Sequence, residues 1–174
     1  MKHSNFLSFI LVVSALGLSA CGSGVDPLQI VAGNSTIPQL GSISTGSLGG
    51  QITAGFTPTT PYWTFGNLAS FGNYISPADG IVSKIGIQTI AGQSLVFINI
   101  VHSARLSTRF SGVPTPIVRV GDTVVATQPV GTFFNGGGVI FQVLLDGNPV
   151  CPLSFMSDSF RANFTSWAAF NPCQ

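Results

Sequence analysis

Short apolar runs separated by turn residues dominate the chain beyond about residue 62. Residues 94–101 are almost wholly apolar, which predicts a strand covered on both faces. Residues 105–111 alternate instead, with Leu106, Thr108 and Phe110 at every second position. We therefore expect a second strand with one buried face and one polar, cationic face.

Turn signals follow these runs. Residues 139–145 form a further apolar run, and Asp146-Gly147 comes directly after it, which is typical of a tight β-hairpin. A Gly-Asp turn at residues 121–122 lies between short β-branched pieces. The pattern indicates short strands joined by tight turns.

A helix is expected only near the C-terminal end. Ser157 or Asp158 can cap a segment that would present Phe160, Phe164 and Trp167 on one face. The predicted fold class is therefore all-β, a compact antiparallel sheet with a short C-terminal helix.

The N-terminus has the pattern of a secretory signal peptide, with a short basic region followed by an apolar run over residues 6–18. That run is shorter than the ~20 apolar residues needed to span a bilayer. Leu-Ser-Ala-Cys at residues 18–21 resembles the bacterial lipobox. We expect removal of residues 1–20, lipidation of Cys21, and anchoring in the cell envelope, in the outer membrane facing the periplasm.

Composition divides the rest of the chain into two parts. Residues 21–60 are rich in Gly, Ser, Thr and Pro and predict a tether. The aromatic cluster that includes Tyr62 and Trp63 marks the start of a β domain over residues 61–174. These aromatic side chains are expected in the core, and an exposed surface for a glycan or a partner is the alternative.

Charge and cysteine usage narrow the function. Charged residues make up 6% of the chain and the net charge is +1, with no basic cluster, which argues against a nucleic-acid partner. Cys151 and Cys173 are the cysteines left after lipidation, and an oxidising exterior favours a disulfide between them. In the chain-entropy model such a bond contributes roughly 3 kcal/mol.

Several motifs together resemble the LytM/lysostaphin-type peptidases in order and spacing. They are SPADGIV at residues 76–82, VH at 101–102, the alternating strand at 106–110, VRVGDTV at 118–124, QPVGT at 128–132, and FQV with DGNP at 141–149. The resemblance implies a compact antiparallel β fold, zinc endopeptidase chemistry and peptidoglycan as the substrate.

The residues that carry this chemistry in the family are missing here. The positions of its His-x-His strand fall on Gly138 and Ile140, and a third histidine position falls on Gly112. The only histidines of the chain are His3 and His102, and it has no glutamate. We interpret His102 as a structural, hydrogen-bonded residue and expect no metal, no cofactor and no catalytic residues.

The best hypothesis is thus a non-catalytic LytM-like lipoprotein that binds peptidoglycan or regulates a cell-wall hydrolase. Its binding groove is expected near Arg105, Arg109 and Gln142, because an arginine fork pairs well with carboxylates. Two alternatives stay open: an envelope adaptor on a hybrid β-barrel fold, and an active peptidoglycan metallopeptidase with unrecognised ligands.

Overall fold

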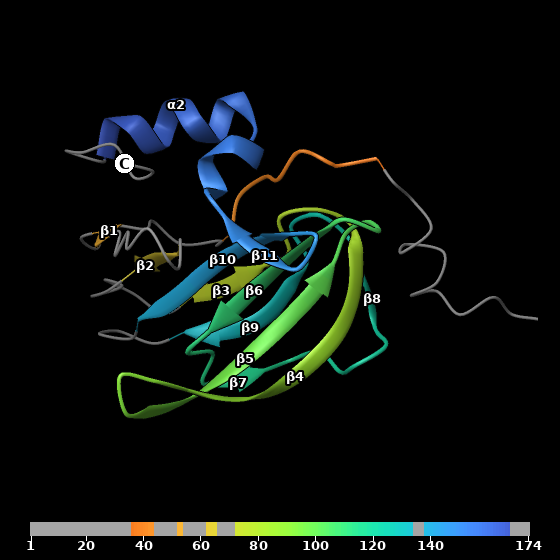
Figure 1. Cartoon of the computed structure of the whole chain (residues 1–174), viewed down its shortest axis with the longest axis vertical. Helices are drawn as coiled ribbons and strands as arrows, with labels where there is room; N and C mark the ends of the chain where they lie inside the picture. Colours follow the sequence, from red (N-terminus) through yellow and green to blue (C-terminus); the bar gives the residue numbers. More distant parts are fainter. Residues whose placement is uncertain (1–35, 44–51, 54–61, 66–71, 134–137, 168–174) are drawn as a thin grey trace, which may run out of the picture.

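The computed structural model describes residues 36–43, 52–53, 62–65, 72–133 and 138–167. These residues form two antiparallel β-sheets and one α-helix near the C-terminal end (Figure 1). The predicted all-β class with a short C-terminal helix is therefore confirmed.

The larger sheet holds eight strands in the order β1-β2-β10-β6-β5-β4-β8, with β11 paired to β10. Their bounds are β1 Ile52–Thr53, β2 Trp63–Phe65, β4 Gly80–Ile90, β5 Gln93–Val101, β6 Leu106–Ser111, β8 Thr123–Val124, β10 Val139–Leu145 and β11 Asn148–Val150. The central strands β10, β6, β5 and β4 are the ones that position the candidate site.

The smaller sheet has the order β3-β9-β7. Its strands are β3 Gly72–Ile75, β7 Thr115–Pro116 and β9 Pro129–Phe133. The last described elements are a 3-10 turn over Pro152–Phe155 and helix α2 over Asp158–Trp167. Tyr74 of β3 lies 5.9 Å from Phe110 of β6 between ring centroids, and 5.0 Å from Phe133 of β9. The two sheets therefore share one aromatic core.

Two predicted strands are present in the structure. Leu106, Thr108 and Phe110 of β6 are buried, while Ser107 and Arg109 between them are only half-buried. Strand β10 has the predicted bounds, and the turn after it has positive φ at Asp146 (50°) and Gly147 (79°), as a two-residue hairpin turn requires.

The sequence pattern missed the longest strand. Residues of β4 pair with β5 from Ile81 to Ile90 through a turn at Ala91 and Gly92, whose φ angles are 49° and 79°. Ala-Gly between the alternating Ile85 and Ile87 and the apolar run at residues 94–101 was the available signal for this hairpin. A register shift between Val82 and Lys84 marks a β-bulge near its base.

The C-terminal helix begins as predicted. The Phe160 backbone N–H donates to the hydroxyl of Ser157 at 3.4 Å, so Ser157 caps α2. The Phe160 ring stacks on Trp63 with centroids 6.2 Å apart, which buries the tryptophan in the core rather than on an aromatic surface. The side chains of Phe164 and Trp167 lie outside what the structure describes.

Part of the predicted tether belongs to the folded unit. Leu40 and Ile43 are 0% and 1% exposed, and the Leu40 backbone exchanges hydrogen bonds with Phe155 and Ser157 at 2.8 Å each. Isolated apolar residues in a Gly/Ser-rich segment carry no periodic signal, so the sequence did not predict this burial. It depends on the surface of the β domain against which Leu40 and Ile43 pack.

Several expectations fall outside the described residues. These include the signal peptide, the lipidation site Cys21 and Cys173, so the disulfide between Cys151 and Cys173 stays a prediction. In the described part of the chain, no helix has the length and apolar character needed to cross a membrane.

One core contact leads to a stability prediction. The Tyr74 hydroxyl is buried without a hydrogen-bond partner among the described residues, and burial raises the pKa of this phenol. Tyr74→Phe should therefore raise the free energy of unfolding by about 1 kcal/mol, because it removes an unsatisfied polar group from the core. Chemical denaturation would measure this, with the half-buried Tyr62→Phe as control. A destabilised Tyr74→Phe would contradict the prediction.

Candidate functional site

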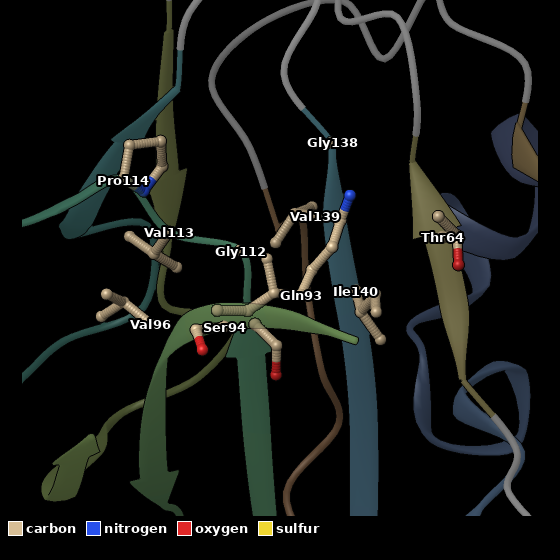
Figure 2. Close-up of a pocket in the computed structure, with 12 residues that line it drawn as sticks. Thr64, Gln93, Ser94, Val96, Gly112, Val113, Pro114, Gly138, Val139 and Ile140 are labelled. Carbon is tan, nitrogen blue, oxygen red and sulfur yellow. The ribbon is translucent and has the colours of Figure 1, made fainter. Parts of the chain in front are cut away.

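A cavity of about 450 Å³ lies where strands β5 and β10 meet the segment after β6. Gly112, Gly138 and Ile140 all line it, so the structure brings together the three positions that the resemblance assigned to histidines (Figure 2). Thr64 of β2 and Val96 of β5 are further lining residues. The three positions therefore share one hollow in the folded chain.

The backbone at Gly112 restricts which residues this position of the hollow can hold. Gly112 has a φ of +88°, and a Cβ added there would lie 2.8 Å from the carbonyl oxygen of Gly138. No real Cβ approaches a backbone oxygen that closely. The position now requires glycine, both for the left-handed conformation and for the close approach.

The residues present do not fit a zinc ion. Zinc in such a site needs three or four nitrogen, sulfur or carboxylate ligands on one centre. The described residues contain no group of three or more His, Cys, Asp or Glu side chains that could hold a metal ion. At the cavity itself, Gly112 and Gly138 offer only backbone and Ile140 offers an aliphatic side chain.

His102 follows the far end of β5, away from the cavity, which holds residues from the start of that strand. It is 5% exposed, its Nδ1 lies 2.8 Å from the carbonyl oxygen of Asp79, and its Nε2 lies 2.9 Å from Oγ1 of Thr108. A carbonyl oxygen can only accept, so Nδ1 carries the hydrogen and Nε2 accepts from the Thr108 hydroxyl.

Burial lowers the pKa of His102 to about 4, although the nearby Asp79 favours the charged form. The imidazole is therefore neutral at physiological pH, with both nitrogens occupied by the fold. These contacts agree with the interpretation of His102 as a structural residue.

A row of four polar side chains crosses the large sheet next to the cavity. In register, Lys84 of β4 pairs with Asn99 of β5, Asn99 with Arg109 of β6, and Arg109 with Gln142 of β10. Because directly opposed residues point to the same face, these four form one line, here called the polar row. The adjacent line includes Ser111 and Ile140, which are cavity residues.

The structure separates the two arginines that were predicted to share a groove. Arg105 precedes β6, at the opposite end from the cavity, and its guanidinium binds the carboxylate of Asp146 at 2.6 Å. This hydrogen-bonded pair raises the pKa of Arg105 and lowers that of Asp146. Arg109 and Gln142 lie in the polar row, whereas Arg105 holds the β10–β11 turn.

Lys84, Gln88, Phe97 and Asn99 were missed by sequence reasoning. They lie on β4 and β5. Gln88 and Asn99 accept hydrogen bonds from Arg109, and Lys84 and Phe97 lie on the same face of the sheet. Strand pairing alone brings these residues together. The polar residues within the apolar runs, Lys84, Gln88 and Asn99, were the available signal.

Comparison with solved structures identifies the fold. A putative M23 peptidase from Pseudomonas aeruginosa superposes with a TM-score of 0.54 at 19% identity, over 74% of this chain and 57% of that one. Csd3 from Helicobacter pylori gives a TM-score of 0.56 at 17% identity, over 74% and 40%. A zinc-containing peptidase from Vibrio cholerae gives 0.50 at 20% identity, over 69% and 40%.

The chain therefore has the fold of M23, or LytM-type, peptidases, and the resemblance seen in its motifs is confirmed at the level of fold. It spans between 40% and 57% of the length of these three structures. No family model matches the sequence, and no curated protein matches it.

Proposed function

We propose that this protein is a non-catalytic LytM-like protein of the cell envelope that binds peptidoglycan or regulates a cell-wall hydrolase through its former catalytic groove. The observation that carries the proposal is the cavity lined by Gly112, Gly138 and Ile140. The hollow is of the size that small ligands occupy, yet it offers no ligand set for zinc. Binding without hydrolysis is the role that such a site supports best.

The location of the protein in the cell envelope is part of the same proposal. The sequence pattern around Cys21 supports lipidation of the mature N-terminus, and a lipid anchor would hold the domain beside the cell wall. Mass spectrometry of the N-terminal peptide from envelope fractions tests this point.

Two measurements on the purified mature chain test the proposed function. We expect substoichiometric zinc and no release of cross-bridge peptides from isolated cell-wall sacculi, because the ligand positions carry glycine and isoleucine. In a pull-down, the chain should sediment with sacculi or retain a cell-wall hydrolase. One zinc per chain together with chelator-sensitive peptide release would contradict the non-catalytic assignment, and retention of neither partner would contradict the binding role.

A further inference from the structure

The polar row holds a cation whose position is fixed by neutral groups. The Arg109 Nε donates to Oδ1 of Asn99 at 2.7 Å, and its Nη1 donates to Oε1 of Gln88 at 3.5 Å. Gln88 is itself held, because its amide nitrogen donates to the hydroxyl of Ser111. The two amide oxygens orient the guanidinium but leave its charge uncompensated.

The charge of Arg109 has no carboxylate partner among the described residues. Two other arginines do: Arg105 pairs with Asp146, and Arg161 pairs with Asp158. Arg109 is half-buried, and the loss of solvation lowers the pKa of its guanidinium. A partly desolvated cation without a counter-ion costs free energy that an incoming anion would recover.

A second cation lies on the same face. Lys84 Nζ is 5.8 Å from the centroid of the Phe97 ring, and the guanidinium carbon of Arg109 is 5.0 Å from the same centroid. Phe97 is buried beneath them at 6% exposure. Lys84 is exposed and also lacks a carboxylate partner in the described part of the chain. Two uncompensated cations thus flank one aromatic ring.

The Arg109 end of the polar row lies next to the cavity. Ser111 and Ile140 are two residues beyond Arg109 and Gln142 along β6 and β10, which is about 7 Å along a strand. The size of the hollow, about 450 Å³, is that of a small-ligand pocket. A globular partner would instead need a contact surface of roughly 800 Å² on each side. The combination favours a short peptide over a folded protein.

We infer that Lys84 and Arg109 bind a carboxylate of a short cell-wall peptide whose chain lies in the cavity. This inference rests on the proposed function and specifies which chemical group of the wall the groove recognises. The planar fork of Arg109, pre-oriented by Asn99, would make the directional hydrogen bonds to the carboxylate. The exposed Lys84 would add a second, adjustable charge.

The experiment compares binding to native sacculi with binding to sacculi whose carboxylates have been amidated with carbodiimide and ammonia. The test variant is Lys84→Gln/Arg109→Gln, and the charge-matched control is Arg105→Gln/Arg119→Gln, which removes two cations outside the polar row. We expect the test variant to bind native sacculi roughly tenfold or more weakly, and the control to stay within about twofold of the parent. Amidation should weaken the parent to the level of the test variant.

Thermal melts of each variant establish that it is folded. Should Arg109→Gln fail to fold, Lys84→Gln alone tests the inference, because Lys84 is exposed and its side chain makes no hydrogen bond within the described residues. It should still weaken binding to native sacculi and leave binding to amidated sacculi unchanged.

The outcomes separate this inference from the proposed function. If the parent binds both kinds of sacculi equally and the Lys84 and Arg109 variants match it, the carboxylate site is overturned while the binding role stands. If the parent binds no sacculi but retains a hydrolase through Arg109, the peptide assignment is overturned. If it binds neither, both proposals fail.

Discussion

Lowering the pH from 7 to 4 should cost this protein roughly 3 kcal/mol of stability through His102 alone. In the unfolded chain a histidine takes up a proton near pH 6.5. In the fold, burial lowers the pKa of His102 to about 4. Between these two pH values the unfolded state binds more protons than the folded state, so the free energy of unfolding falls as the pH falls.

The composition leaves few other side chains that titrate in this pH range. The chain has no glutamate, and its only other histidine is His3 in the predicted signal peptide. The ion pair of Asp146 adds little to the change over this range, because Arg105 lowers the pKa of that carboxyl from 3.8, so its contribution to stability is lost mainly at lower pH. Urea unfolding of the mature chain at pH 7, 5.5 and 4 would measure the loss.

A matched variant isolates the residue. His102→Asn keeps an amide N–H that can donate to the Asp79 carbonyl but cannot titrate, so its stability should be nearly constant over the same range. An NMR titration gives an independent readout, since the imidazole should stay neutral down to about pH 4. An imidazole that protonates near pH 6.5 in the folded protein would refute the assignment.

Restoring a histidine at Gly112 should destabilise the protein and should not create a zinc site. The φ of +88° places a side chain in a left-handed conformation, which costs on the order of 1–3 kcal/mol. The added Cβ would also lie 2.8 Å from the Gly138 carbonyl oxygen, so the β10 entry would have to move. Gly112→His together with Gly138→His and Ile140→His should therefore unfold more easily than the parent. Because the β10 entry has to move, the three imidazoles should not meet at the one centre that stoichiometric zinc requires.

Alanine substitutions separate the cost of the left-handed backbone conformation from the cost of the close contact with Gly138. Gly121 has a similar φ of +93°, but a Cβ added there meets nothing within 4 Å. Gly121→Ala should thus report the backbone cost alone, and Gly112→Ala should be more destabilising by the cost of the contact with Gly138. Equal losses in the two variants would show that the hollow can accommodate a side chain. Metal analysis of the triple-histidine variant completes the test.

Local patterns determined much of this fold. The alternation at Leu106, Thr108 and Phe110 defined the buried face of β6, and Asp146-Gly147 defined the hairpin after β10. These signals can be recognised in the sequence because side-chain direction in a strand has a period of two, and because few residues tolerate positive φ. The absence of histidines at positions 112, 138 and 140 could also be recognised from the sequence, since locating these positions requires only the order of the motifs.

The sequence by itself thus determined the all-β class, the hairpin turn after β10 and the loss of the ligand side chains, because each depends on residues close together in the chain. Only the tertiary structure decided which charges share a surface. Arg105 and Arg109 are four positions apart, yet Asp146 holds the first at the far end of the sheet while strand pairing joins the second to Lys84. The docking of Leu40 onto Phe155 was decided in the same way. Register and long-range packing set these contacts, and the free energy that fixes them comes from partners far away in sequence.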